Sequence, residues 1–129
     1  MKAEDILWRL AHLASLPYQE RYVIGGTADE YLLAEQLLDD IDTVKYFVHR
    51  PVNRSLFTED QMGALEDLFA YNDLHSREAL SGKSQSDQAT LIRESAVWKT
   101  LRAKAGSALE SFGLSTEMSV EEIDRLGGE

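Results

Sequence analysis

Two sets of acidic residues, each ending in a tyrosine, have the spacing of one helix face. The first comprises Glu35, Asp39, Asp42 and Tyr46; the second comprises Asp60, Asp67 and Tyr71, with Ala64 between them. Steps of three and four residues place side chains on one side of a helix. Carboxylates accept hydrogen bonds from lysine and arginine, and tyrosine provides a rigid aromatic contact with a polar tip. Both sets therefore predict a surface for a basic partner, although an ordinary solvated face has the same pattern.

Trp8 is a further candidate contact residue. It projects away from the apolar series formed by Ile6, Leu10 and Leu13 on the first predicted helix, so one contact with the core cannot bury both sides. An exposed tryptophan would be an effective interface anchor. We favour the alternative that segment 18–26 folds back over it, because large apolar side chains usually find cover.

The histidines and the known catalytic motifs give little indication of an enzyme. His12, His49 and His75 fall in separate segments, and His75 with Glu78 is a single pair in the reverse of the Glu-x-x-His order. The chain contains no H-E-x-x-H or G-x-S-x-G motif and no cysteine. We predict no catalytic residues, metal ligands or cofactor, although two carboxylates across a pocket could still act as acid and base.

Two other motifs have ordinary explanations. Residues 81–86 read Ser-Gly-Lys-Ser-Gln-Ser, which lacks the first glycine and the preceding strand of a phosphate-binding loop, so we predict a plain loop. Glu94 lies between the apolar positions Leu91 and Trp98. A carboxylate near the start of a helix is favourable, and this explains Glu94 without a functional role.

The elements that position these side chains are predicted to be helical. The first helix covers about 3–16 and stops at Pro17, and residues 22–24 could form a short extended piece before the turn at Gly25–Gly26. The second helix covers about 27–50, and the third begins at Thr58 and is ended or interrupted at residues 72–73, before a shorter turn through residue 80. The fourth covers about 87–112, followed by a short helix at 119–126.

Local signals mark the ends of these helices. Capping-box pairs are formed by Thr27 with Glu30, Thr58 with Gln61 and Ser119 with Glu122, and Gly113 is a natural terminator. The 129 residues, 43% of them hydrophobic, suffice for one core. We therefore predict a single all-α domain over 1–129, a bundle of four main helices with one or two short ones.

Charge and hydropathy narrow the choice of partner. The formal net charge is −10, and no lysine or arginine occurs from residue 27 to residue 44. Such a chain is repelled by nucleic-acid phosphates and anionic membranes but attracted to basic proteins, although acidity can also serve solubility alone. No apolar run approaches the roughly 18 residues of a membrane span, and Arg9 and His12 interrupt any signal-peptide pattern. A cytoplasmic location is expected.

The leading hypothesis is a stoichiometric binding protein whose acidic helical faces occlude a basic protein. Its most concrete form is an immunity or antitoxin-type protein that neutralises a cationic, nuclease-like toxin. One alternative is a helical adaptor or regulatory subunit that binds through an apolar patch near Trp8. Another is a metal-assisted helical-bundle hydrolase that would depend on His75. A homodimer is compatible with all three.

Overall fold

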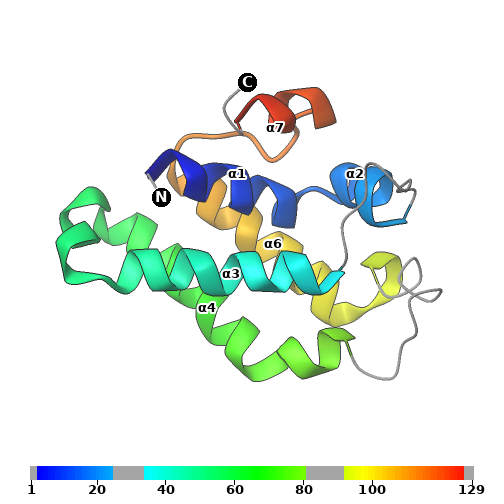
Figure 1. Cartoon of the computed structure of the whole chain (residues 1–129), viewed down its shortest axis with the longest axis horizontal. Helices are drawn as coiled ribbons and strands as arrows, with labels where there is room; N and C mark the ends of the chain where they lie inside the picture. Colours follow the sequence, from blue (N-terminus) through cyan, green and yellow to red (C-terminus); the bar gives the residue numbers. More distant parts are fainter. Residues whose placement is uncertain (1–2, 25–33, 81–91, 127–129) are drawn as a thin grey trace.

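All the regular elements in the described part of the chain are helices (Figure 1), which confirms the predicted all-α bundle. The computed structural model describes residues 3–24, 34–80 and 92–126. The elements are α1 (Ala3–Ala14), α2 (Leu16–Gln19), the π-helical turn η1 (Glu20–Ile24), α3 (Ala34–His49), the 3₁₀ helix η2 (Pro51–Leu56), α4 (Glu59–Leu80), α6 (Ala96–Ser111) and α7 (Val120–Leu126). None of the described helices is both long enough and apolar enough to cross a membrane.

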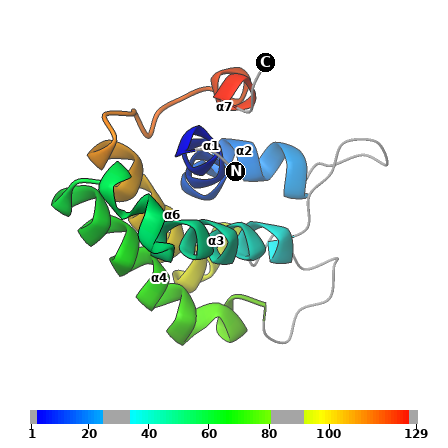
Figure 2. The same ribbon diagram turned by 60° about the vertical axis from the view of Figure 1, so that its left-hand side comes forward.

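Helix α6 has the central position in the bundle. It packs against α4 on one side and α1 on the other, while α3 contacts both α1 and α4 (Figures 1 and 2). Helix α7 lies against α1, and Tyr22 of η1 donates a hydrogen bond to Asp124 of α7 at 2.9 Å. The predicted apolar stripes meet in this core, whose largest fully buried side chains include Ile6, Leu10, Leu13, Leu37, Ile41, Leu65, Leu68, Phe69, Trp98, Leu101 and Leu109.

Several predicted helix ends are confirmed in atomic detail. Thr58 N–H donates to Gln61 Oε1 at 2.9 Å, and Gln61 N–H donates back to Thr58 Oγ1 at 3.2 Å, which is a capping box. Ser119 and Glu122 make the same reciprocal pair. Gly113 has φ = +83°, the left-handed conformation that ends a helix in a Schellman motif. The Thr27–Glu30 pair, the Gly25–Gly26 turn and loop 81–86 lie outside the described residues.

The prediction that Pro17 ends the first helix was wrong. Helix α1 ends at Ala14, and Ser15 has extended backbone (φ −107°, ψ 109°) and caps α2 by accepting a hydrogen bond from Tyr18 N–H at 3.1 Å. Pro17 then lies in the first turn of α2, where its missing N–H costs nothing. The extended piece predicted at residues 22–24 was also wrong, because η1 continues the helical path there.

Two other helix boundaries differ from the prediction. Helix α4 runs through residues 72–73 without interruption, and Asn72 is buried on its core-facing side. The last long helix begins at Ala96, because Ser95 adopts extended backbone and caps it with a 3.5 Å hydrogen bond from Trp98 N–H. Residues 92–94 form a separate helical turn before it. Glu94 is exposed, which agrees with the prediction that it has no functional role.

A buried amide joins three of these segments. Gln19 is fully buried, and its Nε2 donates to the carbonyls of His12 and Leu13 at the end of α1, both at 3.0 Å. Its Oε1 accepts a hydrogen bond from Arg102 of α6 at 3.0 Å, and Arg102 also donates to the Ile92 carbonyl at 2.7 Å. The end of α1, the turn before α6 and α6 itself are therefore held by one connected network.

We predict that Gln19→Leu lowers the free energy of unfolding by about 2–4 kcal/mol, because two buried carbonyls lose their donor and the half-buried guanidinium of Arg102 loses one of its acceptors. Urea unfolding followed by circular dichroism measures the change. A polar-to-leucine substitution at exposed Ser107 is the control, and an equal effect of both substitutions would contradict the role given to Gln19.

Candidate functional site

The first predicted acidic set forms a continuous exposed face on α3, which we call the α3 ridge. Glu35, Asp39, Asp42 and Tyr46 are all exposed, and 73% of Tyr46 is accessible. The opposite side of α3 is buried in the core through Leu37, Leu38, Ile41, Val44 and Val48. Burial of that apolar stripe fixes the rotation of α3, and the ridge is directed outward as a consequence.

The second predicted set does not join the first. Asp60 and Asp67 are exposed and Tyr71 is half-buried, but they lie on the edge of α4 that faces α6 rather than α3. Asp67 Oδ2 accepts a hydrogen bond from Lys104 Nζ of α6 at 2.8 Å, and that ammonium lies 5.6 Å from the ring centre of Tyr71. Part of the negative charge of this set is therefore already neutralised within the protein.

Instead, two acidic residues that were not predicted lie on the α3 side of α4. Asp73 pairs with Lys45 of α3 at 2.7 Å, and Glu66 accepts a hydrogen bond from His49 Nε2. Glu66 and Asp73 are seven residues apart, beside the apolar stripe of α4. This spacing is a signal visible in the sequence, but only packing shows which edge of α4 meets α3.

Negative charge on the α3 ridge is only partly compensated. Partial burial raises the pKa of Asp42 above its ordinary value, and the neighbouring carboxylates of Asp73 and Asp39 raise it further. Lys45 acts in the opposite direction, but its ammonium is bonded to Asp73, a contact that raises its own pKa. Lys45 thus interacts with the carboxylates of Asp73, Asp42 and Glu66, and a further cation at this surface would be favourable.

The structure does not leave Trp8 exposed as an independent anchor. Trp8 is half-buried against the core, and its ring meets the buried His12 edge-on with 4.2 Å between ring centres. Tyr18 stacks on the other side of His12 at 4.2 Å, and Tyr22 follows at 4.7 Å. In the described residues the contact between Trp8 and the segment after α1 is thus indirect, through His12.

Evidence for a metal site is weak in the described part of the chain. Its histidine, aspartate and glutamate side chains include no group of three or more that could hold a metal ion. His75 Nδ1 and Glu78 Oε1 are 2.8 Å apart on the surface of α4, as residues one helical turn apart often are. This pair gives the hydrolase alternative no additional support.

Comparisons with protein-family models, curated proteins and solved structures found no match for this chain. The function must therefore be inferred from the surface itself.

We predict that Asp42→Asn increases stability at pH 7 by about 0.2–0.5 kcal/mol, the size of a like-charge contact on a helix surface. A carboxyl with a raised pKa in the folded state is destabilising when ionised, and this penalty disappears as pH falls through the raised pKa. The advantage of the variant should therefore shrink below that pH. Urea unfolding of both proteins between pH 3.5 and 7 tests this.

The matched control is Asp67→Asn, which removes the same charge from a carboxylate paired with Lys104. That variant should be no more stable than the original protein at pH 7. A gain of equal size in both variants would mean that general charge repulsion, not crowding around Asp42, is responsible.

Proposed function

We propose that this protein is a stoichiometric binding protein that covers a basic surface of another protein with its α3 ridge. The proposal depends on one observation above all: Asp42 is exposed on the α3 ridge beside the largely exposed ring of Tyr46, and its pKa is raised first by partial burial and then by the nearby carboxylates of Asp73 and Asp39. Lysine or arginine from a partner would relieve this repulsion, and Tyr46 would provide the aromatic contact.

The most concrete form of the proposal is an immunity or antitoxin-type protein that neutralises a cationic, nuclease-like toxin in the cytoplasm. Proteins that cleave nucleic acids need positive clefts to hold phosphates, and a row of carboxylates can occupy such a cleft. The overall charge of −10 would accelerate the encounter. A helix anchored by its buried stripe presents its carboxylates with little further loss of entropy.

Within this proposal the α3 ridge is the primary contact, and Asp60, Asp67 and Tyr71 are secondary. Using Asp67 would compete with its bond to Lys104, whereas Glu35, Asp39 and Asp42 are exposed on one uninterrupted face. Asp67 and Tyr71 also lie on the edge of α4 beside Lys104 of α6, whereas the α3 ridge adjoins the other edge of α4 through Asp73.

The adaptor alternative is now better supported on η2 than at Trp8. Val52 and Leu56 of η2 are 73% and 53% exposed, and with Tyr46 and Leu74 they are the large hydrophobic side chains most exposed among the described residues. Apolar binding at η2 would survive high salt, whereas binding through the α3 ridge would weaken. Capture of partners on the tagged protein, with low-salt and then high-salt washes, separates these possibilities.

We predict that the double variant Asp39→Lys, Asp42→Lys slows association with the captured basic partner at least tenfold at low salt, because steering depends on local charge. Both positions are exposed, so the circular dichroism spectrum should be unchanged. Stopped-flow or surface-plasmon measurements at several salt concentrations give the association rates.

The control is Asp60→Lys, Asp67→Lys, which changes the net charge by the same amount on the other edge of α4. It should slow association far less than the α3 variant. Equal slowing by the two variants, or no slowing by the first, would rule out the α3 ridge as the contact.

A further inference from the structure

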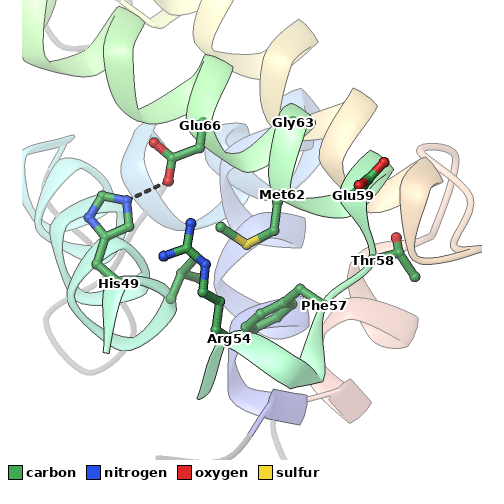
Figure 3. Close-up of a pocket in the computed structure, with 9 residues that line it drawn as sticks. His49, Arg54, Phe57, Thr58, Glu59, Met62, Gly63 and Glu66 are labelled. Carbon is green, nitrogen blue, oxygen red and sulfur yellow. Dashed lines mark hydrogen bonds and ion pairs between the residues drawn. The ribbon is translucent and has the colours of Figure 1, made fainter. Parts of the chain in front are cut away.

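A hollow of about 780 Å³ lies between the end of α3, η2 and the first turns of α4 (Figure 3). This volume is within the range of small-molecule binding sites, about 300–1,000 Å³. Its lining contains none of the α3 ridge carboxylates, so it is a separate feature from the proposed protein-binding face. The lining residues are Val48, His49, Arg54, Phe57, Thr58, Glu59, Met62, Gly63 and Glu66.

The apolar part of this hollow is already held in place. Phe57 and Met62 lie side by side along it in Figure 3. The ring of Phe57 meets Phe47 and Phe112 edge-on, with ring centres 6.4 and 6.1 Å apart. Asn53 Nδ2 also donates to the Phe47 carbonyl at 2.9 Å, which attaches η2 to α3. A ligand would therefore meet a formed surface and would not have to order it.

Gly63 lines the hollow, and no contact with a neighbouring residue requires a glycine at this position. It lies within α4, where glycine is unfavourable relative to alanine. A Cβ built on Gly63 would meet no atom within 4 Å, so no neighbour excludes a side chain there. Gly63 is one of the residues that line the hollow, and we infer that a side chain at this position would reduce the space available to a ligand.

Arg54 is the charged group in the hollow that a ligand could use. Its guanidinium extends over the apolar surface beside Met62 (Figure 3), and it forms no ion pair with any residue in the ranges 3–24, 34–80 and 92–126. The nearby Glu66 carboxylate is hydrogen-bonded to His49, and exposed Glu59 lies on the opposite rim. Guanidinium groups bind carboxylates through paired hydrogen bonds.

We propose that this hollow binds a small amphipathic carboxylate. Its apolar body would lie on Phe57 and Met62 in the space beside Gly63, and its carboxylate would pair with Arg54. An arginine above an aromatic and thioether surface suits this combination of groups. Binding at this site requires neither the α3 ridge nor a protein partner.

Titration of the ¹⁵N-labelled full chain with 3-phenylpropionate, followed by NMR, tests the proposal. Saturable shifts should be centred on the amides of Phe57, Met62 and Gly63, with a Kd in the low millimolar range expected for so small a ligand. The matched probe 3-phenylpropylamine has the same apolar body but a positive charge, and it should bind at least tenfold more weakly.

Three variants test the charge of Arg54 and the space beside Gly63 separately. Arg54→Gln should weaken 3-phenylpropionate binding at least tenfold, whereas Arg50→Gln, an equal charge change outside this lining, should leave the affinity unchanged. Gly63→Ala should raise the melting temperature yet weaken binding, and Gly63→Leu should abolish binding with the circular dichroism spectrum retained.

The absence of saturable shifts, equal binding of the amine, or unchanged affinity in Arg54→Gln would each overturn the proposal. Because no protein partner is used, these outcomes are independent of the α3 ridge.

Discussion

The side-chain amide of Gln19 forms hydrogen bonds with backbone carbonyls at the break between α1 and α2. Where α1 stops at Ala14, its last carbonyls have no intrahelical donor, and this end of the helix is buried. Gln19 Nε2 donates to two of these carbonyls, those of His12 and Leu13, and Gln19 Oε1 accepts a hydrogen bond from Arg102. Burial lowers the pKa of Arg102, an effect opposed by Glu20, so its guanidinium needs the oxygens that Gln19 and Ile92 provide.

The central position of α6 follows from this network and from the core. Arg102 joins α6 to the end of α1, while Trp98 donates its indole N–H to the Ala79 carbonyl near the end of α4, at 2.9 Å. With α1 and α4 both attached to α6, the surface they leave open receives the apolar stripe of α3. The outward direction of the α3 ridge is thus a consequence of contacts made by other helices.

The corner formed by α3, η2 and α4 combines two different chemical surfaces. Carboxylates of α3 and α4 dominate along α3, whereas at η2 Arg54 lies over aromatic and thioether groups (Figure 3). His49 lies where these surfaces meet, three residues after Tyr46, and its bond to Glu66 holds α3 and α4 together there. A protein-binding face and a small-molecule site can therefore be neighbours without sharing their charged groups.

Features that depend only on residues close together in the chain could be predicted before the fold was known. The Thr58–Gln61 and Ser119–Glu122 capping boxes, the turn at Gly113 and the shared face of Glu35, Asp39, Asp42 and Tyr46 all follow from spacings within one helix. The packing of the helices was needed to show that Asp67 pairs with Lys104, that Glu66 and Asp73 lie on the α3 side of α4, and that Arg54 and Gly63 border one hollow. Helical periodicity identifies which residues share a face, but which edge of that face meets a neighbour depends on how distant helices pack.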